Sequence, residues 1–320
     1  MRSLASKRSG SATDEVRRGY AARQDEGHRV TVAFLGLGRM GLGMAGRLRS
    51  TGVALRVFNR TASRADVLVA AGACRCATPR EACTGAAAAF SMVADDAASR
   101  ALWLGADGAL GALPSGAMLI ECSTLSHDWV LELSARAAAL GVRYVDAPVT
   151  GLPEQAATGA LTLLVGAHRA DLEAARPLLD ALAGSIIHFG PVGAGTAYKL
   201  LVNLLGAVQI ASAAEAMAFG ERAGLDPTQL AQALGSGQAA SPQVIRNTRR
   251  MAENQHTGPV HFTPQLRLKD VEYALALAHK LGAGAPFGAL AARWFAELAE
   301  SMPAGINESA IIEVARRQHP

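Results

Sequence analysis

A lysine and an asparagine four residues apart, Lys199 and Asn203, are the side chains of this chain best suited to chemistry. They lie in a run of helix-forming residues that follows Gly193 and Gly195 and continues to about Ala223. A spacing of four places both side chains on one face of a helix. A lysine that points inward from an apolar helix is costly unless it acts chemically, so we predict that Lys199 transfers a proton. Taken alone, the pair fits a solvated surface lysine beside an asparagine equally well.

A glycine-rich loop near the start of the chain predicts a dinucleotide site. It follows the apolar run 30–35 and opens a helical segment, the context in which such a loop is informative. Two of its glycines allow a tight turn and a close approach to a pyrophosphate, and the third lets the helix pack on the strand. An ordinary glycine-rich turn is the alternative. The loop residues are Gly36, Leu37, Gly38, Arg39, Met40 and Gly41.

The end of the second strand indicates which dinucleotide is preferred. Strand 54–58 is followed by Asn59, Arg60 and Thr61. An NAD site usually has an acidic residue there to hold the ribose 2′-hydroxyl, whereas an arginine guanidinium can bind the 2′-phosphate of NADP. We therefore expect NADP(H) to be preferred and NAD(H) to remain possible. Arg60 as a solvated strand-end residue, or Arg64 in its place, is the alternative.

The alternation of short apolar runs and helical stretches predicts the fold class. Strands are expected at 30–35, 54–58, 87–92, 118–121, 143–145, 161–165 and 185–189, and helices between them include 128–140 and 171–183. Strand and helix in alternation mean a mostly parallel sheet covered on both faces. After residue 189 only helical patterns remain, broken at Pro227, Pro242, Pro259 and Pro286. We predict an α/β protein: a disordered polar tail (1–29), a Rossmann-type NADP-binding domain (30–191) and an all-helical substrate and dimerisation domain (192–317).

Composition narrows the classes of partner. The net charge is +4, and the basic residues are scattered rather than grouped with aromatics, which argues against nucleic acid. Polar residues interrupt the most apolar stretch, 200–219, so no membrane span is expected. The four cysteines do not form Cys-x-x-Cys, and no metal site is expected. The polar first 29 residues lack the apolar core of a secretory signal, and we expect a cytoplasmic protein with reduced thiols.

Five ordered motifs make the chain resemble the β-hydroxyacid dehydrogenase family, which includes 3-hydroxyisobutyrate dehydrogenase and 2-hydroxy-3-oxopropionate reductase. The resemblance covers about residues 30–317. The motifs are the loop 36–41 with Met44-Ala45 after it, Ser123-Thr124-Leu-Ser126, Asp146-Ala-Pro-Val-Thr-Gly151, Gly193-x-Gly195-x-x-x-Lys199-x-x-x-Asn203, and Lys269-Asp270.

The resemblance implies roles for particular residues. Lys199 would be the catalytic acid and base, and Asn203 would help to hold the substrate. The segment 146–151 would offer hydroxyl and backbone N–H groups to a substrate carboxylate. We therefore assign substrate binding to Ser123, Thr150, Gly151 and Leu152, and cofactor binding to Met92, Val93, Thr124 and Lys269 in addition to the residues above. Ser123 or Ser126 as a helix N-cap is the alternative for the serine motif.

The expected reaction joins these roles in a cleft between the two domains. Hydride transfer to an aldehyde carbon builds negative charge on its oxygen, which a protonated Lys199 would stabilise and protonate. Burial, or a neighbouring cation such as Lys269, would lower the pKa of Lys199 towards the working pH. The expected substrates are small carboxylate-bearing semialdehydes and their 3-hydroxy acids, turned over by a homodimer or homotetramer.

Some residues depart from the family pattern. Family members commonly have two glycines after the loop serine, whereas this chain has Thr150-Gly151-Leu152-Pro153, in which Pro153 has no N–H. Asn307-Glu308 takes the place of an acidic position. The backbone N–H groups of Gly151 and Leu152 are expected to stay available, and Leu152 to make the pocket narrower or more apolar. The alternatives to this reaction are an imine reductase, which usually lacks the lysine, and a non-catalytic NADP-binding scaffold.

Overall fold

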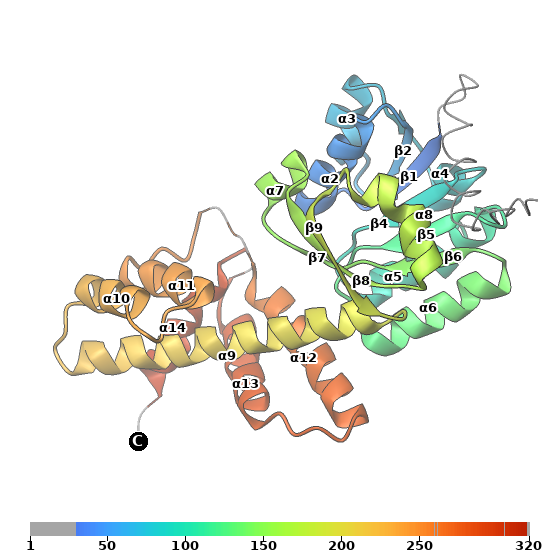
Figure 1. Cartoon of the computed structure of the whole chain (residues 1–320). Helices are drawn as coiled ribbons and strands as arrows, with labels where there is room; N and C mark the ends of the chain where they lie inside the picture. The colour runs from blue at the N-terminus through green and yellow to red at the C-terminus, as the bar shows by residue number, and fades with distance from the viewer. Residues whose placement is uncertain (1–29, 259, 261, 304, 319–320) are drawn as a thin grey trace, which may run out of the picture. The chain divides into compact units, whose positions relative to one another are not determined.

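The computed structural model describes residues 30–258, 260, 262–303 and 305–318. The predicted tail, 1–29, lies outside the described residues. The chain divides into two compact units (Figure 1). Unit 1 comprises residues up to Thr124 and Asp128–Thr196, and unit 2 comprises Leu125–His127 and the residues from Ala197 onward. Each unit is described by itself.

Unit 1 is built on one twisted sheet. Its strands are β1 (Thr31–Leu35), β2 (Ala54–Phe58), β3 (Cys74–Arg75), β4 (Ala88–Ser91), β5 (Met118–Glu121), β6 (Arg143–Asp146), β7 (Val149–Thr150), β8 (Leu161–Gly166) and β9 (Ala183–Gly190). The order is β3-β2-β1-β4-β5-β6-β8-β7, with β9 beside β8. Strands β1 to β6 pair in parallel, whereas β8 runs antiparallel to β6 and β7. The carboxyl ends of β1, β2, β4 and β5 therefore share one edge of the sheet, where open α/β sheets bind ligands.

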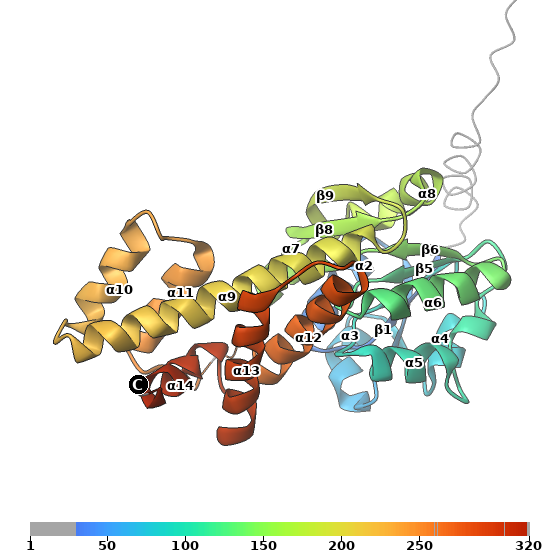
Figure 2. The ribbon, with the colours of Figure 1, turned by 90° about the horizontal axis from the view of Figure 1, so that it is seen from below.

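Helices connect these strands and cover the sheet (Figure 2). The α-helices of unit 1 are α2 (Arg39–Arg49), α3 (Asp66–Ala70), α4 (Pro79–Cys83), α5 (Asp96–Leu104), α6 (His127–Ala139), α7 (Pro153–Thr158) and α8 (Arg169–Leu179). Short 3₁₀ turns lie at Ala62–Ala65 and Leu110–Ala112. Strands β4 and β5 are buried over their whole length, as expected when both faces of a parallel sheet are covered.

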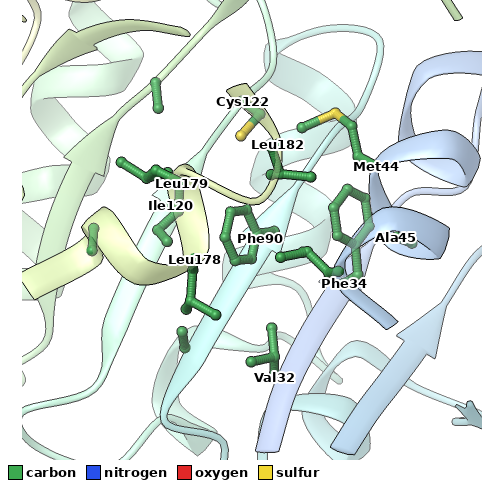
Figure 3. Packing of buried hydrophobic residues seen from close by; sticks show 14 of the residues in the cluster. Val32, Phe34, Met44, Ala45, Phe90, Ile120, Cys122, Leu178, Leu179 and Leu182 are labelled. Atoms are coloured by element: carbon green, nitrogen blue, oxygen red, sulfur yellow. The ribbon is translucent and has the colours of Figure 1, made fainter. Parts of the chain in front are cut away.

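The core of unit 1 forms where apolar strand residues meet α2 and α8. Val32 and Phe34 from β1 lie beside Phe90 from β4, with Met44 from α2 and Leu178 from α8 packed over them (Figure 3). The rings of Phe34 and Phe90 stack, with centroids 5.9 Å apart. This packing fixes the ends of the strands, and with them the loops that follow β1 and β4.

The structure confirms the fold class and corrects details of the elements. Strands β3 and β7 are not predicted, because two residues are too few to show a period of two. The predicted helix 171–183 ends earlier, at Leu179, since residues 183–190 join the sheet as β9. The four cysteines are free thiols, and only Cys74 is exposed.

Unit 2 is helical throughout the residues that the structure describes. Its helices are α9 (Ala194–Arg222, whose first residues belong to unit 1), α10 (Pro227–Ser236), α11 (Pro242–Ala252), α12 (Pro264–Lys280), α13 (Pro286–Ser301) and α14 (Ile312–Arg317), with a 3₁₀ turn η3 at Glu308–Ile311. Proline stands at the first position of α10, α11, α12 and α13, where its missing N–H has no helical partner to lose.

Helix α9, with 29 residues, is the longest element among the described residues and is rich in apolar side chains. An 18-residue window of it has a mean hydropathy of 1.5, so by length and composition it could cross a membrane. The core helix of a soluble protein passes the same test. Of that window, 39% is buried in the structure. The buried part includes Ala207, Ile210, Ala214 and Met217, which lie in a cluster with Phe295 and Leu298 of α13.

Candidate functional site

The loop between β1 and α2 has the geometry of a phosphate cradle. Gly36 has φ +96°, and a Cβ on it would lie 2.4 Å from the carbonyl oxygen of Met92. A Cβ on Gly41 would lie 2.0 Å from the carbonyl oxygen of Gly36, so strand, loop and helix meet by backbone contact. A Cβ on Gly38 would meet no atom within 4 Å. The space that Gly38 leaves open faces the start of α2, whose first turn contains no acidic residue.

Asn59 holds this loop rather than offering its amide outward. Its Oδ1 accepts a 2.8 Å hydrogen bond from the backbone N–H of Leu37, and its Nδ2 donates to the carbonyl oxygen of Thr61. Arg60, Thr61 and Arg64 are exposed just beyond it. Asn59 therefore ties the end of β2 to the glycine-rich loop, with Arg60 and Arg64 exposed beyond it.

Ser123 is buried and hydrogen-bonds to residues of neighbouring segments. Its hydroxyl accepts a 2.8 Å hydrogen bond from the N–H of Val93, and its own N–H donates to Oε1 of Glu121. The hydroxyl thus joins the loops after β4 and β5, a contact that was not anticipated from the sequence. Glu121 was missed by sequence reasoning. It is fully buried at the end of β5, and burial raises the pKa of its carboxyl group.

The segment after β6 corrects one expectation about backbone donors. The N–H of Leu152 donates a 2.9 Å hydrogen bond to Oε1 of Gln155 and is therefore not available as we expected. Gly151 has φ +144°, a conformation that disfavours any side chain at this position. Thr150 and Leu152 are exposed, and the Leu152 residue is 37% exposed. The side chains of this loop, more than its N–H at position 152, are free to meet a substrate.

Three polar residues of unit 2 form one cluster with the predicted proton-transfer lysine. Asn203 donates from Nδ2 to Oδ2 of Asp270, 2.5 Å away. Oδ1 of the same carboxylate lies 2.9 Å from Nζ of Lys269. Asp270 is 1% exposed, and its charge also acts on Lys199, one helical turn before Asn203. Lys199, Asn203, Lys269 and Asp270 are therefore an electrostatic unit.

The electrostatics of this cluster match the demands of acid–base chemistry near neutral pH. Desolvation by burial lowers the pKa of Lys199 to about 8, and the charges of Arg267 and Lys269 add to the lowering, whereas Asp270 opposes it. Both burial and Lys269 were anticipated from the sequence. A lysine with a pKa near 8 has substantial populations of both protonation states at neutral to mildly alkaline pH.

A buried ion pair contacts the backbone of Asn203. Nε of Arg267 lies 2.7 Å from Oε2 of Glu308, and both side chains are 4% exposed. Nη1 of Arg267 donates to the carbonyl oxygen of Asn203, and its guanidinium stacks on Phe262. Sequence reasoning noted Glu308 only as a departure and missed Arg267 and Asp270 as site residues. Asn203, which both side chains contact, and Glu308, which pairs with Arg267, lie more than 40 residues away in sequence, so no local pattern joins them to Arg267 or Asp270.

Comparison with known proteins identifies the family. A family model described as the NAD binding domain of 6-phosphogluconate dehydrogenase matches residues 31–190. A second, the NAD-binding domain of NADP-dependent 3-hydroxyisobutyrate dehydrogenase, matches residues 193–315. The chain belongs to the β-hydroxyacid dehydrogenase family. Like its relatives, it is an NAD(P)-dependent dehydrogenase that acts on CH–OH groups.

Several characterised β-hydroxyacid dehydrogenases are similar over most of the chain. An NAD-dependent L-serine dehydrogenase of Pseudomonas aeruginosa is 36% identical over 81% of this chain and 89% of its own. A 3-hydroxyisobutyrate dehydrogenase of the same organism is 33% identical over 89% and 98%. The solved Mycobacterium tuberculosis 3-hydroxyisobutyrate dehydrogenase with L-serine is 32% identical, covers 90% of this chain and 99% of its own, and superposes with a TM-score of 0.81.

The similarity to solved imine reductases shows a shared fold. The Bacillus cereus imine reductase BcSIRED is 22% identical, with a TM-score of 0.58.

The family assignment also accounts for the cradle at Gly38, since an NAD(P) pyrophosphate needs an open backbone and a helix start without acidic side chains. Over the described residues, no three His, Cys, Asp or Glu side chains are grouped to hold a metal ion.

Proposed function

We propose that this enzyme is an NADP(H)-dependent oxidoreductase that interconverts a small carboxylate-bearing semialdehyde and its 3-hydroxy acid, with Lys199 as the general acid and base. The observation that carries the proposal is the lysine itself, with a pKa lowered to about 8 and an asparagine one turn away held by a buried carboxylate. Imine reductases usually lack this lysine, and a non-catalytic scaffold has no use for its lowered pKa.

The residues of the chain divide the chemical work as follows. The nicotinamide, when bound, supplies the hydride for reduction and accepts it in oxidation. In reduction, the protonated Nζ of Lys199 donates its proton to the oxygen of the aldehyde, leaving a neutral amine that regains a proton from solvent. In oxidation, the neutral amine accepts the hydroxyl proton. Asn203, with its Nδ2 fixed by Asp270, orients the substrate oxygen and does not compete for the proton.

The preference for NADP(H) is part of the proposal. Arg60 is exposed directly after β2, while Asn59 is occupied with the glycine-rich loop. No acidic side chain stands at positions 59–61, where an NAD site would use one. A guanidinium there can bind the 2′-phosphate through two N–H groups.

The substrate class rests on the relatives and on Leu152. The similar proteins are named for L-serine, 3-hydroxyisobutyrate, and glyoxylate or succinic semialdehyde. All four compounds are small carboxylates with a hydroxyl or aldehyde group. A partly exposed leucine in the substrate loop favours an aldehyde with an apolar substituent, such as methylmalonate semialdehyde, over one with a second polar group.

The deciding experiment measures NADPH and NADH oxidation against tartronate, methylmalonate and succinate semialdehydes, glyoxylate and a cyclic imine. L-serine and 3-hydroxyisobutyrate are assayed in the oxidative direction. We expect turnover of an acid aldehyde with NADPH preferred, and a fall of about 10²–10⁴-fold in kcat for Lys199→Ala with unchanged NADPH binding. Lys280→Ala, at an exposed lysine of α12, is the matched control. Turnover of the imine alone, or equal activity of Lys199→Ala, would refute the proposal.

We also propose that the enzyme is a homodimer or homotetramer assembled through unit 2. Leu201, Leu205, Phe219 and Phe287 are between 52% and 75% exposed, which is unusual for large apolar side chains on a monomer. Light scattering of the purified full chain tests this proposal, and a monomeric mass at micromolar concentration would contradict it.

A further inference from the structure

The carboxyl group of Asp146 binds the start of the helix that carries Lys199. Asp146 is the last residue of β6 and is fully buried. Its Oδ2 accepts hydrogen bonds from the backbone N–H groups of Gly193, at 3.1 Å, and Thr196, at 2.8 Å. Its Oδ1 accepts a third from the hydroxyl of Thr196, at 2.6 Å. All of these atoms belong to unit 1.

These bonds make Asp146 an N-cap supplied from a distant strand. Helix α9 begins at Ala194, so Gly193 is the cap position and Thr196 the third residue of the first turn. A cap side chain normally accepts from the N–H of the second or third residue, and glycine has none to offer. Asp146 supplies the missing acceptor from 47 residues away, and its negative charge is favourable at the start of a 29-residue helix.

Two glycines bring the turn against the sheet and so fix it in a second way. A Cβ on Gly195 would lie 2.2 Å from the carbonyl oxygen of Leu164 in β8. A Cβ on Gly166 would lie 2.7 Å from the carbonyl oxygen of Pro191. Gly166 is also the residue that pairs with Asp146 between β8 and β6. The start of α9 is therefore bound by side-chain hydrogen bonds and by backbone packing at the same point of the sheet.

Burial of the Asp146 carboxyl group has a desolvation cost, and the hydrogen bonds described above for this group go to the first turn of α9. Burial raises the pKa of Asp146 to about 7, against the lowering effect of its bonds to Thr196 and Gly193, and Glu121 raises it further. Burying a carboxyl group carries a desolvation cost that an apolar side chain of similar volume does not have. What it does provide is a fixed position for the first turn of α9.

We propose that Asp146 is a positioning residue for Lys199, through Thr196. Lys199 follows Thr196 by three residues on the same continuous helix, so any movement of the first turn also moves Nζ. Asp146 is also the first residue of the segment 146–151, to which we assign part of the substrate contact. One carboxylate thus fixes both the proton donor and the start of the substrate loop. The inference rests on the proposed role of Lys199.

Thr196→Val removes the hydroxyl donor and keeps the shape of the side chain, whereas Thr196→Ser keeps the donor. We expect kcat of Thr196→Val to fall about 10- to 100-fold, because a small misplacement of a catalytic group costs this much. KM should change less than about 3-fold, and Thr196→Ser should stay within about 3-fold of wild type. Affinity for NADPH should be unchanged in both variants. Asp146→Asn, which replaces one of the two accepting oxygens with an NH₂ donor and removes the negative charge, should lose at least as much.

A second measurement does not depend on activity. Amide hydrogen exchange of peptides covering 193–203 should be faster in Thr196→Val than in wild type or Thr196→Ser. Wild-type kcat in Thr196→Val, or equal losses in Val and Ser variants that follow their melting temperatures, would overturn the inference. If Asp146→Asn fails to fold, Thr196→Val still decides. Failure of the proposed function is distinguishable, because it would appear as full activity in Lys199→Ala.

Discussion

At the scale of single residues, Asp270 is the group whose charge controls the candidate acid–base lysine. It holds Asn203 and Lys269 and opposes the effect of burial on Lys199. Asp270→Asn removes a negative charge that favours the protonated amine, so the pKa of Lys199 should fall below about 8. The rate of aldehyde reduction, which needs the protonated amine, should then begin to decline at a lower pH than in wild type.

The measurement is the pH dependence of kcat/KM for reduction and oxidation in both proteins. The two limbs should move together, since oxidation needs the neutral amine and should gain at lower pH. Glu272→Gln, at an exposed position two residues further along α12, removes the same charge from outside the cluster and should leave both limbs in place. An unmoved profile in Asp270→Asn would show that another group sets the limb.

Arg60 carries the predicted preference for NADP(H). Arg60→Ala should raise the KM for NADPH about 10-fold or more and leave the KM for NADH nearly unchanged, because only NADPH has a 2′-phosphate to lose a partner. Initial rates with each cofactor measure both constants. Arg64→Ala tests the neighbouring alternative, and Arg169→Ala, an exposed arginine of α8, is the control. An equal rise with NADH would mean that Arg60 does not discriminate between the cofactors.

The predicted pair of catalytic residues lies on one helix, whereas the site residues that the sequence does not predict come from distant parts of the chain. Lys199 and Asn203 share one helix face, so a spacing of four predicts their placement. Asp270, Arg267 and Glu308 meet that face across sequence separations that no period encodes. Two hydrogen bonds, from the N–H of Leu37 to the Asn59 side chain and from the N–H of Leu152 to the Gln155 side chain, likewise depend on loop geometry, which composition does not determine.

At the scale of elements, the junction of β1 and α2 predicts opposite effects for two glycines. Gly41→Ala places a Cβ 2.0 Å from the carbonyl oxygen of Gly36, so it should destabilise unit 1 by about 2 kcal/mol or more. Gly38→Ala meets open space, so the fold should keep its melting temperature. The new methyl group would instead occupy the phosphate cradle and weaken NADPH binding about 10-fold or more.

Thermal melting and NADPH titration of both variants separate these effects. Gly111→Ala, in the 3₁₀ turn of unit 1 with no atom within 4 Å of its Cβ and no positive φ, should change neither property. A stable Gly38→Ala protein that binds NADPH as wild type does would refute the placement of the cradle.

Helices and strands were predictable from the sequence where the element is long enough for its hydrophobic periodicity to be recognised. Helix α9 extends from Ala194 to Arg222, close to its predicted end at about Ala223. Strands β3 and β7 have two residues each and depend on their neighbours for pairing. The end of α8 depends on β9, whose pairing with β8 takes residues 183–190 into the sheet.

At the scale of the whole molecule, the lysine that serves the reaction should reduce stability. The pKa of Lys199 is 10.5 when unperturbed and about 8 in the fold. Between these values the unfolded chain binds a proton that the folded chain does not, so the free energy of unfolding rises with pH across this window. Below about pH 8 the folded protein bears the whole cost of a charged, desolvated amine.

Lys199→Met removes that charge and keeps most of the side-chain volume. At pH 7 we expect its free energy of unfolding in urea to exceed that of wild type by about 1–3 kcal/mol, although the variant should be inactive. The difference should shrink as pH rises from about 8 towards 10.5, because the wild-type lysine then becomes neutral in both states. Lys280→Met, at an exposed lysine, should show no such difference at either pH. A Lys199→Met protein less stable than wild type at pH 7 would mean that the cluster around Asp270 needs the ammonium group for its own stability.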